Sequence, residues 1–262
     1  MNAINRKYPL KRQPVDERDA KFAVERMAEG LPDKVDLRGL CPPVYDQGSL
    51  GSCTANAGIA AYTVLKQTTE EHARLYLYFM ERLIEGNVDE DAGASMRDIG
   101  KALQKYGVCC EKTWPYIESK YRNRPYATAD LEAAKYKIDA YRAVPSLRSA
   151  KALLASGHVV LTGMEVYESF ERTGSDGVVP PVGARDQCLG GHAIMLAGYD
   201  DHFCKKVGGI REFIARVFGK STQAETYFLA RNSWGDGWGQ GGYFWMPESY
   251  VRKYCYDMWL LE

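Results

Sequence analysis

Apolar residues recur every three or four positions in the first half of the chain, which is the spacing of an amphipathic helix. Residues 53–67, 73–85 and 95–106 all show this pattern. A shorter pattern covers about residues 20–27, and Gly107 follows the third long stretch as a helix C-cap would. We therefore expect three helices, and a short one near the N-terminus, before about residue 136.

The second half of the chain carries short, continuous apolar runs in place of helical spacing. These runs lie at residues 159–161, 193–197, 227–230 and 242–246, and they have the length and composition of strands. Residues 202–225 place charges and glycines between two of these strands, which indicates a long exposed loop or a hairpin extension. Helices followed by strands predict an α+β fold with two lobes.

The first residues differ from the rest of the chain. Residues 1–34 are polar and charged, and the Gly-Leu-Pro sequence at 30–32 breaks the short helical pattern there. We interpret 1–34 as an N-terminal extension or short pro-segment, and 35–262 as the folded domain. Within that domain we expect a helical lobe over roughly 45–135 and a β lobe over roughly 136–262.

Charge and hydropathy narrow the classes of partner. The 34 basic and 34 acidic residues balance, so the chain has no overall field that would attract nucleic acid or an anionic membrane. No apolar run approaches the roughly 18 residues that span a bilayer. The N-terminus shows no secretory signal peptide, so we expect a cytoplasmic location.

Cysteine and histidine counts argue against a metal site or another cofactor. The chain has 7 cysteines, an odd number, and no pair of them is spaced as CxxC. Only 4 histidines are present, too few and too scattered to indicate a zinc site. We expect no metal and no cofactor, and most of the cysteines to be reduced.

Residues 46–53 (Asp-Gln-Gly-Ser-Leu-Gly-Ser-Cys) deliver Cys53 to the first position of the first long helix. The N-terminus of a helix carries free N–H groups and a partial positive charge, both of which favour the nucleophilic thiolate. The Cys53 N–H and the side-chain amide of Gln47 are candidate donors to an oxyanion. The alternative is a buried structural cysteine at the start of a helix.

His192 stands at the leading edge of the 193–197 strand, after two glycines. Imidazole is a suitable base for a thiol near neutral pH, and as imidazolium it can protonate a leaving amine. The alternative is a core histidine bonded to a backbone carbonyl. His72, His158 and His202 have no comparable setting, and we interpret them as structural or surface residues.

Residues 231–243 form the most specific segment, with five glycines and two tryptophans in thirteen positions. The Asn232 side-chain carbonyl can accept the second N–H of a histidine and so hold its tautomer. Trp234 can shield that bond from water. The alternative is a glycine-rich turn beside packed aromatic rings.

Together these three segments resemble the papain-like cysteine peptidase family. The loop residues Gln47, Gly51 and Ser52 match its motif around Cys53. His192 follows Cys53 by 139 residues, inside the roughly 130–150 that the family shows. Asn232 follows by 179 residues, and the 202–225 insertion accounts for the excess. The resemblance covers roughly residues 35–262.

Two departures from the family pattern matter. Leu50 replaces a cysteine of the family, so one family disulfide should be missing, and Thr54 replaces an aromatic residue. Ala94 follows Gly93 where the family has two glycines along the substrate cleft.

The resemblance implies a helical left lobe, an antiparallel β-barrel-like right lobe and an active-site cleft between them. It also implies an endopeptidase that acts on protein or peptide substrates and prefers an apolar side chain two residues before the cut. The implied catalytic residues are Cys53, His192, Asn232 and Gln47, and the implied substrate-binding residues are Gly93, Ala94, Gly191, Ala193 and Trp234.

Residues 1–34 are too short for the long propeptide of family zymogens. We hypothesise that this segment nevertheless lies across the cleft and limits access, the alternative being a tail or a brace elsewhere. Two rival functions remain open at this point. One is a non-catalytic peptide-binding homologue, and the other is a Cys-His amidase or acyltransferase that uses the same chemistry on another acceptor.

Overall fold

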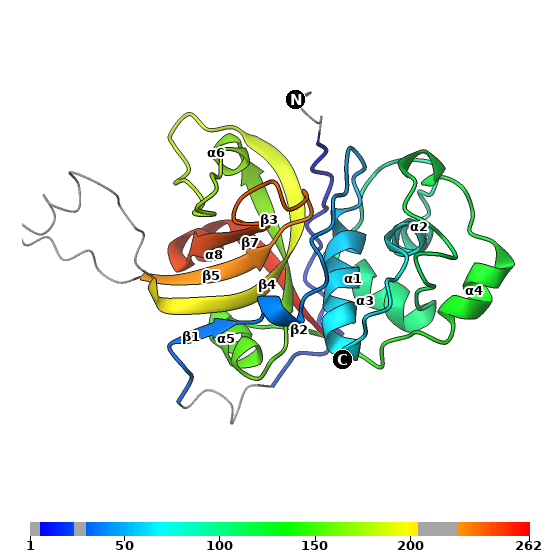
Figure 1. Ribbon diagram of the computed structural model, residues 1–262, viewed down its shortest axis with the longest axis horizontal. Helices are drawn as coiled ribbons and strands as arrows, with labels where there is room; N and C mark the ends of the chain where they lie inside the picture. The colour runs from blue at the N-terminus through cyan, green and yellow to red at the C-terminus, as the bar shows by residue number, and fades with distance from the viewer. Residues whose placement is uncertain (1–5, 24–29, 204–224) are drawn as a thin grey trace, which may run out of the picture.

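The computed structural model describes residues 6–23, 30–203 and 225–262. Two lobes lie side by side, one built around helices and the other around a sheet (Figure 1). The predicted α+β two-lobe architecture is confirmed. The predicted helix near residues 20–27 falls mostly outside the described residues, and residues 20–23 are not helical.

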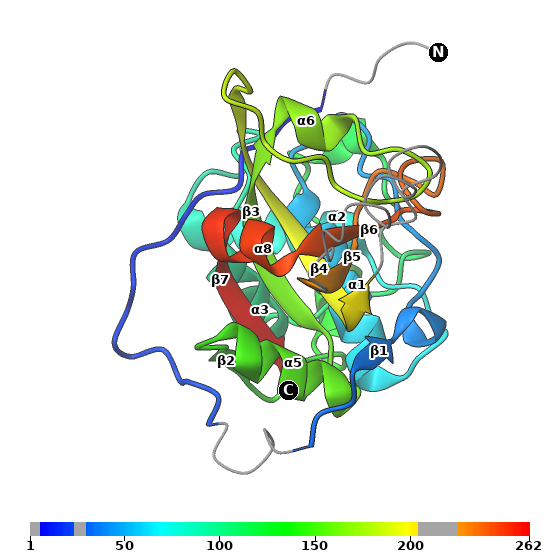
Figure 2. The ribbon, with the colours of Figure 1, turned by 90° about the vertical axis from the view of Figure 1, so that its left-hand side faces the viewer.

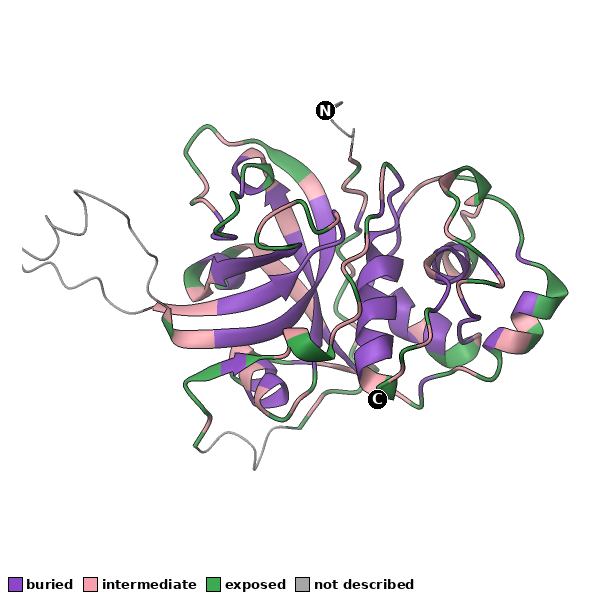
Figure 3. Ribbon diagram, in the orientation of Figure 1, coloured by how far each residue is buried: buried purple, intermediate pink, exposed green. Residues whose placement is uncertain are grey.

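The helical lobe contains α1 (Cys53–Lys66), α2 (Arg74–Glu85), α3 (Met96–Lys105) and α4 (Ala127–Ala133). The first three agree with the predicted helices to within about one residue, whereas the pattern did not indicate α4. Helix α1 runs along the boundary between the lobes and is buried over nearly its whole length (Figure 3). Burial on all sides explains why apolar and small residues occupy so much of its surface.

The second lobe is an antiparallel sheet. Its strands are β1 (Lys34–Asp36), β2 (Tyr141–Ala143), β3 (Val160–Tyr167), β4 (Cys188–Phe203), β5 (Glu225–Arg231), β6 (Tyr243–Pro247) and β7 (Cys255–Leu261). They pair in the order β2-β7-β3-β4-β5-β6, and β1 pairs with β4. In the described part of the chain β2 and β6 are the two ends of this order, so the expected barrel-like sheet is not closed.

Short helices cover the sheet. They are α5 (Leu147–Ala155), α6 (Glu168–Glu171) and α8 (Glu248–Tyr254), and Figure 2 shows α5 and α8 against the same side of the strands. Two 3₁₀ turns, Arg38–Leu40 and Glu118–Lys120, lie in loops. Among the described residues, none of the helices has the length and apolar character needed to cross a bilayer.

The N-terminal residues pass between the two lobes (Figure 1). The backbone of Leu10 donates to the Gly191 carbonyl in β4, and that of Lys11 donates to the Ala94 carbonyl before α3. Farther along, Phe22 donates to the Ala143 carbonyl in β2. The segment therefore bonds first to both lobes and then to the edge strand of the sheet.

Cysteines in the described residues are all free, namely Cys41, Cys53, Cys109, Cys110, Cys188 and Cys255. Leu50, which stands where a family cysteine was expected, is buried in the core. The described part of the chain contains no cluster of His, Cys, Asp and Glu that could hold a metal ion.

Candidate active site

Cys53 is the first residue of α1 and is fully buried. The loop before it is held from the helical lobe, because the Gly51 N–H donates to the Asp91 carboxylate at 3.0 Å. The backbone N–H groups of Cys53, Thr54 and Ala193 lie close to the sulfur and lower the pKa of the thiol, which favours the thiolate. The placement at a helix start, predicted from the loop sequence, is confirmed.

His192 lies on β4 opposite Met164 of β3 and is fully buried. Its Nε2–H donates to the Asn232 Oδ1 at 2.8 Å. That bond assigns the proton to Nε2 and leaves Nδ1 as the basic nitrogen. Nδ1 has no hydrogen-bond partner among the described residues, and the neighbouring Ala193 N–H faces the Cys53 sulfur. The fold thus brings the predicted base to the predicted nucleophile.

Asn232 directly follows β5, and its Oδ1 also accepts the Ser233 N–H at 2.8 Å. Two donors on one oxygen hold the side chain in a single orientation. The Trp234 ring lies 5.2 Å from the His192 ring, centroid to centroid, with 34° between the planes. Because Trp234 is only 4% exposed, it shields the imidazole from water, as the sequence suggested.

Gln47 is oriented by two further hydrogen bonds. Its Oε1 accepts from the Ser233 hydroxyl at 2.6 Å, and its Nε2 donates to the Leu50 carbonyl at 2.9 Å. Because these two bonds fix the orientation of the amide, the second N–H of Nε2 is available to donate to an oxyanion. Ser233 therefore orders Asn232 through its N–H and Gln47 through its hydroxyl.

Burial favours the neutral forms of both Cys53 and His192. It raises the pKa of the Cys53 thiol to about 12, against the opposing effect of the surrounding N–H groups. It lowers the pKa of the His192 imidazole to about 4, and the nearby Arg6 guanidinium adds to this effect. Both shifts favour the neutral thiol and imidazole over the thiolate–imidazolium pair.

The N-terminal segment causes much of this burial. The Tyr8 ring lies edge-on to His192, with centroids 6.2 Å apart, and 6.0 Å from the Trp234 ring. The Arg6 guanidinium lies 4.8 Å above the Trp234 ring. Leu10 is 6% exposed and packs between the lobes.

All five predicted substrate-binding residues line or adjoin this segment or the catalytic pair. The Gly191 N–H donates to the Tyr8 carbonyl at 3.0 Å, and the Ala94 carbonyl accepts from Lys11 at 3.3 Å. Gly93 has a φ of 67°, and a Cβ there would lie 2.5 Å from the Pro9 carbonyl oxygen. Glycine is therefore required at this position of the cleft wall.

Sequence reasoning missed several residues that support the site. Asp91 holds the Gly51 loop, and Ser233 orients the two amides. Glu81 of α2 is fully buried and accepts from the Thr54 hydroxyl at 2.6 Å, and burial raises its pKa well above the ordinary value. The position of Ser233 inside the 231–243 segment was the one available sign of these supporting residues. Glu81 lies in ordinary helical sequence and Asp91 in ordinary loop sequence.

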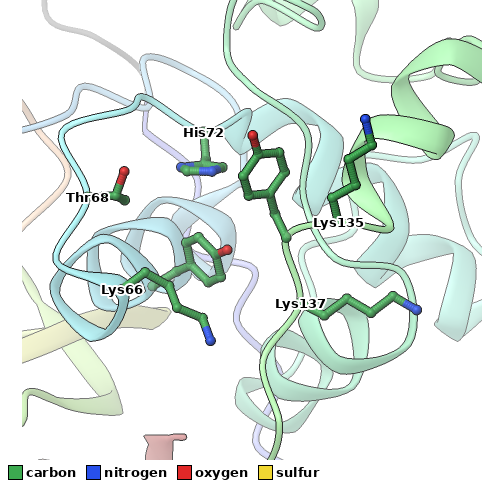
Figure 4. Close-up of a pocket in the computed structure, with 7 residues that line it drawn as sticks. Lys66, Thr68, His72, Lys135 and Lys137 are labelled. Carbon is green, nitrogen blue, oxygen red and sulfur yellow. The ribbon is translucent and has the colours of Figure 1, made fainter.

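A separate pocket of about 300 Å³ lies at the other end of α1 (Figure 4). Helix α1 has 14 residues, so the pocket is about 20 Å from Cys53. The amino groups of Lys66, Lys135 and Lys137 point in different directions around His72. The pocket belongs to neither the catalytic centre nor the cleft.

Known proteins resemble this chain in sequence and in fold. The chain is 33% identical over 235 residues to an uncharacterized peptidase C1-like protein of Acanthamoeba polyphaga mimivirus, covering 83% of this chain and 68% of that one. It is 25% identical over 233 residues to Falcipain-3 of Plasmodium falciparum, covering 84% of this chain but 42% of the relative.

Among solved structures, xylellain, a cysteine protease from Xylella fastidiosa, superposes with a TM-score of 0.83 at 35% identity, covering 98% of this chain and 96% of that one. The model of the papain family cysteine proteases matches residues 31–256. With this match over most of its length, and with Cys53, His192 and Asn232 gathered at one site, the chain belongs to the papain family of cysteine proteases.

Proposed function

We propose that this cysteine endopeptidase cuts peptide bonds with Cys53, His192, Asn232 and Gln47, and that its own N-terminal residues hold it inactive until they leave the cleft. The observation that carries the proposal is the path of residues 8–11, which bond to Gly191 on one lobe and to Ala94 on the other. The same backbone groups would bind an extended substrate.

In the open enzyme the Cys53 thiolate attacks the carbonyl carbon of the scissile bond. The Cys53 N–H and the Gln47 amide stabilise the oxyanion that forms. His192, as imidazolium, gives its proton to the leaving amine, and the C–N bond breaks to leave an acyl-enzyme. A water molecule then loses a proton to His192 and attacks the thioester, and the C–S bond breaks to release the carboxylic acid and the Cys53 thiolate, which restores the thiolate–imidazolium pair.

The carbonyl groups of Tyr8 and Pro9 are held against the walls of the cleft. The Tyr8 carbonyl accepts the Gly191 N–H, and the Pro9 carbonyl lies against Gly93. Both oxygens thus face the cleft walls and not the Gln47 amide. A peptide bound in this way blocks substrates while escaping attack itself.

Inhibition also has an electrostatic part. The segment keeps water from Cys53 and His192. This burial raises the pKa of the thiol and lowers the pKa of the imidazole, so the neutral pair is favoured. Withdrawal of Tyr8 and Arg6 would rehydrate the site and remove a positive charge near the imidazole. The thiolate–imidazolium pair is then favoured by the helix start and by Asn232.

The test compares the full-length chain with a variant that lacks residues 1–22, in reductant, on a quenched peptide library. Leu10→Asp is a second way to open the cleft without deletion, because it places a charge at a position where the side chain is buried. Val15→Asp is the matched control, because Val15 in the same segment is 93% exposed.

We expect truncation and Leu10→Asp to raise turnover at least tenfold, Val15→Asp to leave it unchanged, and Cys53→Ala to abolish it in every background. Equal turnover by the full-length and opened forms would refute the inhibitory role. Turnover that survives Cys53→Ala, or its absence from every form, would refute the proposed peptidase site.

A further inference from the structure

Two carboxylates on the helical-lobe side of the cleft hold lysines of the N-terminal segment. The Lys7 amino group lies 2.8 Å from the Asp91 carboxylate, and that of Lys11 forms an ion pair with Glu85. These lysines are four residues apart, so along an extended chain the two acidic positions are separated by about 13 Å. The wall of the cleft is therefore negative at two points.

Glu85 is held in place independently of the segment. It is the last residue of α2, and Asn87 donates to its Oε2 at 3.0 Å. Its side chain is 16% exposed with Lys11 in contact. A carboxylate this covered loses a favourable interaction when the lysine departs, unless another cation takes its place.

Lys11, which binds Glu85, directly follows the buried apolar residue Leu10. Leu10 fills a pocket at the sheet lobe, where a Cβ on Gly163 would lie 2.9 Å from its side chain and one on Gly191 would lie 3.1 Å from its Cβ. The Tyr256 ring lies against the same two glycines, and Gly191 directly precedes His192, so this pocket adjoins the catalytic pair. An apolar and a basic side chain on adjacent residues thus bind opposite walls beside the nucleophile.

We propose that Glu85 is a specificity-determining residue, which selects substrates carrying lysine or arginine next to the apolar residue that enters the Leu10 pocket. This inference rests on the proposed function, because it takes the segment as a template for what the open cleft binds. Asp91 adds negative charge to the same wall but also holds the Gly51 N–H, so it is a poorer site for a test.

The test uses the full-length Leu10→Asp protein and two quenched peptides that differ at one position. One peptide carries lysine next to leucine, and the other carries norleucine, which has a similar length without the charge. The readout is the ratio of kcat/KM for the two peptides, in which any general loss of activity cancels. Glu85→Gln removes the charge, Glu85→Lys reverses it, and Glu90→Gln is a control on an exposed carboxylate nearby.

We expect a ratio of about ten or more for the lysine peptide, the value of one charge-assisted hydrogen bond in a partly buried site. Glu85→Gln should bring the ratio close to one, Glu85→Lys should favour a matched glutamate peptide, and Glu90→Gln should leave the ratio as it was. A ratio near one in the starting protein, or one that survives Glu85→Gln, would overturn the assignment.

A binding measurement separates this inference from the proposed function. Fluorescence anisotropy of the labelled peptides on Leu10→Asp/Cys53→Ala protein requires no turnover. Tighter binding of the lysine peptide that is lost in Glu85→Gln supports the role of Glu85 even if no peptide is cleaved. Equal affinities for the lysine and norleucine peptides refute it even if both are cleaved.

Discussion

Tyr8 lies edge-on to His192, with 89° between the ring planes and 6.2 Å between the centroids. These residues are far apart in sequence, and their contact places the N-terminal segment directly over the catalytic imidazole. Because Tyr8 also donates to the Glu171 carboxylate in α6, its ring is held from outside the site. The segment is thus held over His192 by specific contacts, each of which can be removed.

Gln47→Ala should lower kcat on the order of 10²-fold or more in the opened enzyme while changing KM little, because the amide acts on the oxyanion of the transition state. Ser233→Ala removes the hydroxyl that orients Gln47 and should cost less, since the amide donor remains. Steady-state kinetics on one fluorogenic peptide measure both effects. A loss confined to KM would contradict the oxyanion role.

Asn232→Ala should reduce kcat on the order of 10-fold to 10²-fold, because His192 loses the acceptor that holds its tautomer. It should also lower the free energy of unfolding by about 1–3 kcal/mol, since the buried Nε2–H is left without a partner. Turnover and denaturant unfolding measured on the same sample test both effects. Unchanged kcat alongside the stability loss would make Asn232 purely structural.

The reaction of Cys53 with iodoacetamide should depend on pH differently in the closed and opened forms. In the closed form burial raises the pKa of Cys53, so the thiolate fraction and the rate keep rising above pH 9. In Leu10→Asp the pKa of the thiol should fall and that of His192 should rise from about 4, which produces a plateau near neutral pH. Superimposable profiles would show that the segment does not control ionisation.

Salt should weaken the hold of the segment through its two lysine pairs. Lys7 is 54% exposed and Lys11 45%, so each pair is screened at high ionic strength. Cys53 labelling in the full-length chain should rise about fivefold at most between 0.05 and 1 M NaCl. In a Lys7→Gln/Lys11→Gln double variant, Cys53 should be labelled faster at low salt, and the labelling rate should no longer depend on salt. If the double variant responds to salt as the unaltered chain does, these two ion pairs are not the cause of the salt response.

Local sequence was sufficient for the elements that carry the catalytic residues. The glycine-rich loop followed by helix-forming residues predicted Cys53 at the start of α1, and the apolar run after His192 predicted its strand. Strand β7 and helix α4 were not indicated. Helix α4 spans only seven residues, and Asp257, with a φ of 51°, interrupts the apolar residues of β7.

The sequence by itself was enough to propose Cys53, His192 and Asn232 as nucleophile, base and orienting amide, because helix and strand periodicity and loop glycines are properties of neighbouring residues. Only the tertiary structure decided three contacts. Leu10 packs in the cleft, Glu85 forms an ion pair with Lys11, and Glu81 accepts a hydrogen bond from Thr54. Each of those contacts joins residues at least 27 positions apart. Such partners are selected by the packing of whole lobes and the burial of charge, which no short stretch of sequence encodes.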